Sequence, residues 1–216
     1  MDPLVEPAVV DPLRWRAERE KAYNRMARDQ YIGYLDHEIR GLLEDIFSIE
    51  GYYPTSSCSG RIIAIDSPYP WRRRDSYLVM KKHSEISGNE VRKLAETPVI
   101  TTLWLIASGP IIHIMARTPG HAMRLLRIAR EAGFKHSGLL ASSKRGYLVE
   151  LVTGIWVAIP IKIQSIVLID LNRAEEVAGI ANRSLAEGRQ RLEALRRSIE
   201  KLKKIYSQDR LEPSLS

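Results

Sequence analysis

The sequence of 216 residues contains one cysteine, Cys58, two phenylalanines and no long run of apolar residues. A single cysteine excludes an internal disulfide framework, and with five scattered histidines it gives no spacing typical of a zinc site. No stretch approaches the roughly 18 consecutive apolar residues of a membrane span. The first eleven residues carry neither the basic nor the apolar segment of a secretory signal. We therefore expect a cytoplasmic protein that binds no metal and no membrane.

The sequence also lacks a Gly-x-Gly motif between an expected strand and an expected helix, where Rossmann-type folds place their phosphate-binding loop. It has instead an alternation of β-branched runs and amphipathic segments. This pattern predicts an α+β fold in which β-hairpins and strands pack with helices. We expect one domain over residues 1–216, with flexible ends at 1–11 and 209–216. A long C-terminal helix over 172–206 is expected to pack on the body.

Hydrophobic spacing and capping residues define the expected elements. Asp11 followed by Pro12 is a typical helix start, and so is Thr118 followed by Pro119. The expected helices cover residues 12–30, 35–47, 88–96, 119–133 and 172–206. The expected strands lie in a hairpin over 52–66 and at 77–82, 99–107, 111–115, 148–152, 155–161 and 166–169.

The charge of the chain favours a polyanionic partner. The formal net charge is +7 and the isoelectric point is about 9.6, which suits nucleic acid. The loop over 67–75 holds two prolines and places aromatic residues beside three consecutive arginines, a mixture that can neutralise phosphates and stack bases. The alternative is an ordinary charged loop. The predicted RNA contacts are Arg72, Arg73, Arg74, His83, Lys144 and Arg145.

The stretch from Tyr52 to Asp66 is polar and small in its middle and β-type at both ends, which predicts strand, turn and strand. Its hydroxyls, its flexible glycine and its guanidinium can together hold a carboxylate or a phosphate. The alternative is a serine-rich β-turn with an ordinary arginine. The residues of this expected ligand cradle are Ser56, Ser57, Cys58, Gly60 and Arg61, with Cys58 as a small packing residue.

A faint internal repeat relates two parts of the chain. The string Ser-Gly-Arg-Ile-Ile-Ala-Ile over 59–65 aligns with Ser-Gly-Pro-Ile-Ile-His-Ile over 108–114. Because side chains alternate along a strand, this alignment places Asp66 and His113 on equivalent faces, where they can converge. The alternative is that His113 is a core or strand-pairing histidine.

The segment Ser56-Ser57-Cys58-Ser59-Gly60-Arg61 resembles the Ser-Ser-Cys-x-Gly-Arg signature of the tRNA wybutosine-synthesising methyltransferases, the third enzyme of the wybutosine pathway. Pro54 stands where that family has Ser or Thr. The segment Gly-Phe-x-x-Ser-Gly over 133–138 and the Lys-Arg-Gly turn over 144–146 also resemble the family. Asp66 matches the family's Asp after the signature, and His113 matches the His of its Pro-x-x-x-His segment.

The resemblance implies an enzyme that is not a Rossmann methyltransferase and that methylates a ring nitrogen of the tricyclic guanosine derivative at position 37 of phenylalanine tRNA. It implies S-adenosylmethionine as the cofactor and a monomer or weak homodimer. Asp66 and His113 are the expected catalytic residues. The expected cofactor-binding residues are Ser56, Ser57, Cys58, Gly60, Arg61, Ser137 and Gly138. The alternatives are a non-catalytic RNA-binding protein whose Ser-rich loop grips phosphate, and a structural protein that uses its long helix.

Overall fold

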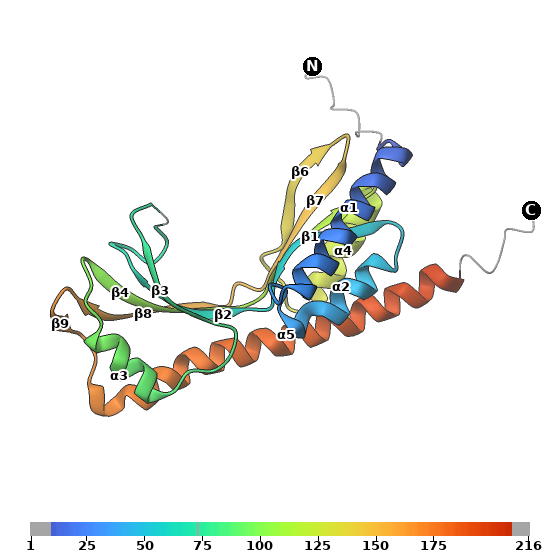
Figure 1. Cartoon of the computed structure of the whole chain (residues 1–216). Helices are drawn as coiled ribbons and strands as arrows, with labels where there is room; N and C mark the ends of the chain where they lie inside the picture. The colour runs from blue at the N-terminus through green and yellow to red at the C-terminus, as the bar shows by residue number, and fades with distance from the viewer. Residues whose placement is uncertain (1–9, 73, 209–216) are drawn as a thin grey trace, which may run out of the picture. The chain divides into compact units, whose positions relative to one another are not determined.

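The computed structural model describes residues 10–72 and 74–208, and the chain forms two compact units, each with its own sheet (Figure 1). The first unit comprises Met1–Cys58, Ile111–Thr153 and Arg191–Ser216. The second unit comprises Ser59–Pro110 and Gly154–Gln190. The expectation of a single domain stays a prediction.

The first unit is a four-stranded antiparallel sheet with helices. The strand order is β1 (Tyr52–Cys58), β5 (Ile111–Ala116), β7 (Gly146–Val152) and β6 (Gly138–Ser143). The helices are α1 (Pro12–Tyr31), the 3-10 turn η1 (His37–Ile39), α2 (Arg40–Phe47), α4 (Pro119–Glu131) and the end of α5 (Ala174–Gln208). Alternate strand residues such as Ile112, Ile114 and Leu151 are buried in one core with side chains of the helices. The residues between them lie on the other face.

The second unit is a five-stranded antiparallel sheet. Its order is β3 (Tyr77–Lys82), β2 (Arg61–Asp66), β4 (Thr102–Ser108), β8 (Trp156–Ile163) and β9 (Ile166–Val167). Helix α3 (Gly88–Glu96), the 3-10 turn η2 (Leu171–Arg173) and the start of α5 complete it. The core of this unit joins Ile62, Leu105 and Ile161 from the sheet to Val91 of α3 and Leu185 of α5.

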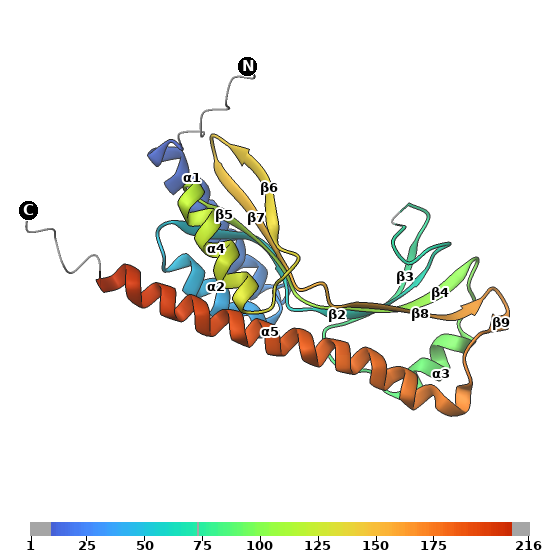
Figure 2. The ribbon, with the colours of Figure 1, turned by 180° about the vertical axis from the view of Figure 1, so that it is seen from behind.

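Helix α5 can be followed along its whole length in Figure 2, and its apolar stripe serves both units. Its first part buries small residues and Leu185 in the core of the second unit. Its second part buries Leu192, Leu195, Ile199 and Leu202 in the core of the first. The stripe expected from the sequence therefore faces the chain's own two cores. No helix in the described residues is long and apolar enough to cross a membrane.

The α+β class and most expected elements are confirmed. Asp11 caps α1 by accepting from the backbone N–H of Leu13 at 2.8 Å, and Thr118 caps α4. The hairpin expected over 52–66 is wrong, because β1 pairs with β5 and β2 pairs with β3 and β4. An alternation of strand, small polar residues and strand does not specify pairing partners. Here the segment links two sheets.

Two element starts differ from expectation by three or more residues. The helix expected from residue 35 begins with the turn η1, whose start Asp36 caps by accepting from Glu38 N–H at 3.2 Å, and α2 follows at Arg40. The strand expected from residue 99 begins at Thr102, because the preceding N–H groups of Ile100 and Thr101 bind a carboxylate instead of a neighbouring strand.

Candidate functional site

A row of residues crosses the sheet of the first unit at one level. Ser56 of β1 lies opposite His113 of β5, His113 lies opposite Glu150 of β7, and Glu150 lies opposite Gly138 of β6. On β5 and β7 the residues to either side of His113 and Glu150 are buried in the core. Because strand side chains alternate, His113 and Glu150 are directed to the opposite face of the sheet from these neighbours, and they share that face with Ser56.

The side chains of this row form a hydrogen-bonded chain. Ser56 Oγ lies 2.6 Å from His113 Nδ1, and His113 Nε2 lies 2.9 Å from Glu150 Oε1. An ionised carboxylate only accepts hydrogen bonds, so Nε2 carries the proton. In the neutral imidazole Nδ1 then has a lone pair and accepts from the Ser56 hydroxyl. The exposed serine oxygen can therefore accept a proton from a bound molecule and pass its own to the ring.

A β-bulge at the signature sets the direction of Ser56. Pro54 lies opposite Ile114 and Ser56 opposite His113, so Thr55 is an extra residue on β1. Proline lacks an N–H and is tolerated at bulges, and the Thr55 hydroxyl donates to the His113 carbonyl at 3.3 Å. Pro54, where the sequence departs from the family pattern, therefore belongs to the bulge that brings Ser56 to the histidine ring.

Asp66 lies in the second unit and has partners of its own. Its carboxylate accepts from the N–H of Ile100 at 2.6 Å, and from the N–H and hydroxyl of Thr101 at 2.9 and 2.6 Å. Burial raises the pKa of this carboxyl, but the hydrogen bonds from Thr101 and Ile100 outweigh it and hold the pKa below its ordinary value. The carboxylate that binds His113 Nε2 is Glu150 rather than Asp66, and a catalytic role of Asp66 stays a prediction. The repeat gave equivalent faces, but the two strands belong to different sheets.

The expected cofactor residues of the signature divide between the ends of two strands. Ser57 and Cys58 end β1 and are half-buried, whereas Gly60 is buried and Arg61 begins β2 with an exposed side chain. Gly60 has φ +108, and a Cβ there would lie 2.9 Å from the Ser108 carbonyl oxygen, so only glycine fits. Hydroxyls and an exposed guanidinium are a donor set that fits the carboxylate end of an amino-acid-like cofactor. Their binding role stays a prediction.

Ser137 and Gly138 differ in what they offer to a ligand. Ser137 is buried, and its hydroxyl donates to the Phe134 carbonyl at 2.7 Å and accepts from Val152 N–H at 3.0 Å. That hydroxyl joins the start of β6 to the end of β7 and has a structural role. Gly138 has no heavy atom within 4 Å of a virtual Cβ, so open space lies beside it, opposite Glu150. A cofactor role for either residue stays a prediction.

The loop between β2 and β3 carries the expected RNA contacts of the second unit. Tyr69 and Trp71 are exposed and stack with ring centroids 5.2 Å apart and planes 13° apart. Arg72 pairs with Asp75 at 3.4 Å, and Arg74 is exposed. Arg73 lies outside the described residues. The loop thus presents a stacked aromatic pair beside cations, as the RNA interpretation requires.

The remaining expected RNA contacts lie in different settings. Nδ1 of His83 donates to the Gly60 carbonyl at 2.8 Å, so this half-buried histidine supports the signature turn. Lys144 and Arg145 are exposed at the turn between β6 and β7, where they can reach a polyanion. RNA contact by these three residues stays a prediction.

Sequence reasoning missed Glu150, the residue that binds Nε2 of His113. Its signal is one acidic residue inside the apolar run Leu-Val-Glu-Leu-Val of β7. A carboxylate at such a position is costly unless it has a partner. Placing it beside His113 required the register of β5 and β7, which the sequence alone does not give.

Known proteins resemble this chain over most of its length. A model of the family described as Methyltransferase TYW3 matches residues 17–201. A protein of Saccharolobus solfataricus is 39% identical over 185 residues, which cover 85% of this chain and 88% of the relative. A protein of Thermococcus kodakarensis is 31% identical over 86% of this chain and 93% of its own length. Both relatives are named as tRNA(Phe) 7-((3-amino-3-carboxypropyl)-4-demethylwyosine(37)-N(4))-methyltransferases.

Solved structures share the fold. A Pyrococcus horikoshii protein superposes with a TM-score of 0.80 and 26% identity, over 86% of this chain and 96% of that one. An Aeropyrum pernix protein gives a TM-score of 0.70 and 29% identity, over 77% and 98%. The α+β architecture therefore recurs in structures of related sequence.

Proposed function

Because the chain belongs to the methyltransferase TYW3 family, we propose that it methylates a ring nitrogen of the wyosine-type guanosine at position 37 of phenylalanine tRNA, in wybutosine biosynthesis. S-adenosylmethionine is the methyl donor of such an enzyme. The observation that supports a reaction at this site is the hydrogen-bonded chain from Ser56 through His113 to Glu150, which begins in the family signature. The compartment is proposed to be the cytoplasm and the active form a monomer or weak homodimer.

The cofactor would supply an electrophilic methyl group bonded to a positively charged sulfur. When that carbon–sulfur bond breaks, the sulfur would leave as a neutral thioether. Arg61 is the group that would hold its carboxylate, since an exposed guanidinium binds a carboxylate with two parallel hydrogen bonds. The Ser56 hydroxyl donates to His113 Nδ1, and its oxygen keeps lone pairs that can accept a further hydrogen bond. The protein's main tasks are to align the reacting nitrogen and to remove its proton.

The hydrogen-bonded chain of Ser56, His113 and Glu150, called the relay below, can take up that proton. A nitrogen that gains a methyl from a sulfonium becomes positive unless it loses a proton. The Ser56 oxygen accepts the proton while its own passes to His113 Nδ1, and the resulting imidazolium is held by Glu150 through Nε2. The charge so formed lies beside a carboxylate, which stabilises it. Asp66 takes no part in this step, because its carboxylate is committed to Ile100 and Thr101.

The direct test is methyl transfer by the purified full chain from methyl-labelled S-adenosylmethionine to phenylalanine tRNA that carries the unmethylated tricyclic base. Mass spectrometry of the digested tRNA should show one added methyl on that nucleoside. tRNA binding without methyl transfer would contradict the proposal and favour a non-catalytic RNA-binding protein.

Variants of the relay give the sharper result. His113→Ala and Glu150→Gln should each lower the single-turnover rate about 100-fold, the low end for acid–base catalysis. The double variant should lose little more than His113→Ala, because both side chains serve one step. His136→Ala is a matched control, since His136 is exposed beyond α4. Losses that multiply in the double variant, or that follow a fall in melting temperature, would make the pair structural.

A further inference from the structure

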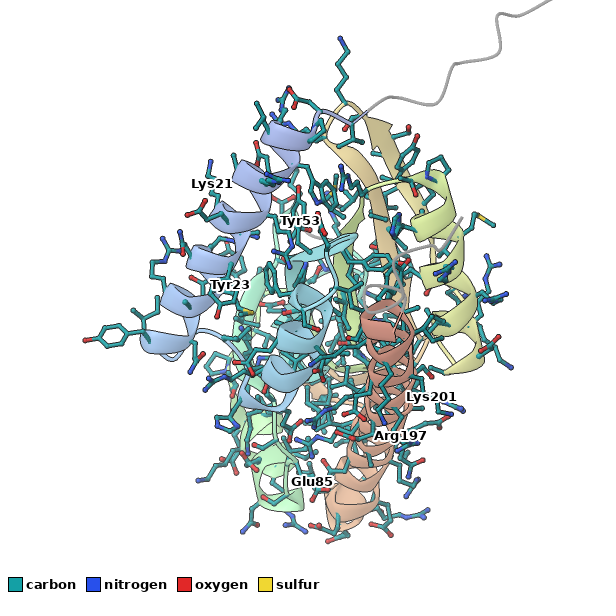
Figure 3. The ribbon with its side chains drawn as sticks, turned by 90° about the vertical axis from the view of Figure 1, so that its right-hand side faces the viewer. Lys21, Tyr23, Tyr53, Glu85, Arg197 and Lys201 are labelled. Atoms are coloured by element: carbon teal, nitrogen blue, oxygen red, sulfur yellow. The ribbon has the colours of Figure 1, made fainter. Side chains whose placement is uncertain are left out.

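A pocket of about 560 Å³ lies between α1 and the sheet of the first unit. Its walls come from α1, from β1 and β5, and from Arg145 at the turn between β6 and β7. Figure 3 labels two of its residues, Lys21 on α1 and Tyr53 on β1. The lining residues include Glu18, Lys21, Tyr53, Thr55, Met115 and Arg145.

The pocket adjoins the relay on one face of the sheet. Met115 lies two residues beyond His113 on β5, so both side chains are on the same face and about 7 Å apart along the strand. Thr55 lines the pocket, donates to the His113 carbonyl and precedes Ser56 in the chain. A group held in the pocket can therefore belong to a molecule whose reacting atom lies at the relay.

The charges around the pocket are of both signs. Arg25 donates to the Thr55 carbonyl, and Arg28 pairs with Asp29 at 2.8 Å. Within the described chain, the side chains of Glu18, Lys21 and Arg145 form no hydrogen bond or ion pair. Burial raises the pKa of Tyr53, with smaller contributions from Glu18, which raises it, and Arg145, which lowers it. Glu18, Tyr53 and Arg145 thus line one pocket, and the charges of Glu18 and Arg145 both act on the tyrosine hydroxyl.

We propose that this pocket receives the 3-amino-3-carboxypropyl side chain of the substrate base, with Lys21 and Arg145 binding its carboxylate and Glu18 its ammonium. This inference rests on the proposed function, because the side chain is named in the substrate of the relatives. A zwitterion needs both a cation and an anion as partners, and the walls of this pocket carry both. A phosphate of the tRNA backbone would use only the cations.

The test measures equilibrium binding of two forms of phenylalanine tRNA, one with 3-amino-3-carboxypropyl-4-demethylwyosine and one with 4-demethylwyosine. Wild type should bind the first form more tightly. The double variant Lys21→Gln/Arg145→Gln should lose about 10- to 100-fold in affinity for the first form beyond its loss for the second. Glu18→Gln should also reduce the preference for the first tRNA form, although this change makes the pocket more positive.

A control variant with the same change in net charge separates binding in the pocket from general electrostatic attraction to the tRNA. Arg197→Gln/Lys201→Gln removes two exposed cations from α5, which Figure 3 shows away from Lys21 and α1. This control variant should weaken the binding of both tRNA forms equally. The inference would be overturned if Lys21→Gln/Arg145→Gln lost the same affinity for both tRNA forms while Glu18→Gln bound them as tightly as wild type or more tightly. That result would assign the pocket to a backbone phosphate. Wild type that methylates neither form would instead overturn the proposed function, and the inference with it.

Discussion

At the scale of single residues, Asp66 shows how a buried carboxylate can have a structural task. It lies at the end of β2 and organises the chain just before β4 through three hydrogen bonds. Asp66→Asn should destabilise the protein by about 1.5–3 kcal/mol at neutral pH, the range for hydrogen bonds to a charged group. Thermal melting of both proteins across pH 3 to 8 measures this.

The sign of the pH dependence follows from the lowered pKa. A carboxyl whose pKa is depressed in the folded protein contributes stability above its ordinary pKa of 3.8 and loses it as the pH falls through the folded value. The difference in melting temperature between wild type and Asp66→Asn should therefore be full above about pH 5 and shrink below pH 4. The exposed Asp75 supplies the control Asp75→Asn. Lost methyl transfer with unchanged melting would return Asp66 to the catalytic site.

What the sequence reveals at this scale depends on whether a residue's neighbours are local. His113 was expected to lie beside Asp66, but the carboxylate that binds its ring is that of Glu150, 37 positions away along the chain. Ser137 was expected in the cofactor site because the segment Gly-Phe-x-x-Ser-Gly over 133–138 resembles the family. The hydrogen bonds to Phe134 and Val152 show its structural role, which the sequence alone does not give, and its cofactor role stays a prediction.

At the scale of elements, the loop between β2 and β3 is the clearest candidate for RNA backbone contact in the second unit. Arg72→Gln/Arg74→Gln should make the plot of log binding constant against log salt shallower by about two, because each phosphate contact releases counterions. Cofactor affinity should stay the same, since these residues lie outside the signature. Filter binding or fluorescence titration at several salt concentrations gives the slope.

Two cations elsewhere in the same unit control for net charge. Lys93 of α3 and Arg183 of α5 are exposed, and Lys93→Gln/Arg183→Gln changes the charge equally. This control should leave the salt slope close to that of wild type. If both double variants changed the slope by the same amount, the effect would come from net charge, and the loop would have no special role.

Elements with local signals were predictable, and their pairing was not. Capping pairs such as Asp11 with Pro12 gave the helix starts, since capping depends on neighbours in sequence. The serine-rich segment was expected to close a hairpin, yet β1 and β2 belong to different sheets. Two residues, Ser59 and Gly60, connect the strands, and nothing in their identity distinguishes a tight turn from a crossing between sheets.

At the scale of the whole molecule, α5 joins two hydrophobic cores through one covalent helix. Leu185 is buried in the core of the second unit and Leu195 in that of the first. Replacing either leucine by alanine should lower the free energy of unfolding by about 2–5 kcal/mol, the usual range for a large buried side chain. Because a helix is stabilised cooperatively along its length, loss of one core should weaken the helix that the other core needs.

The predicted single domain therefore has a specific consequence. Leu185→Ala and Leu195→Ala should each lower the midpoint of one common unfolding transition, seen identically by circular dichroism and by tryptophan fluorescence. The exposed Ile180 on the same helix gives the control Ile180→Ala, which should shift stability by no more than about 0.5–1 kcal/mol, since it opens no cavity. Two separate transitions, each moved by only one leucine variant, would mean that the cores unfold independently. The chain would then be two domains that share a helix.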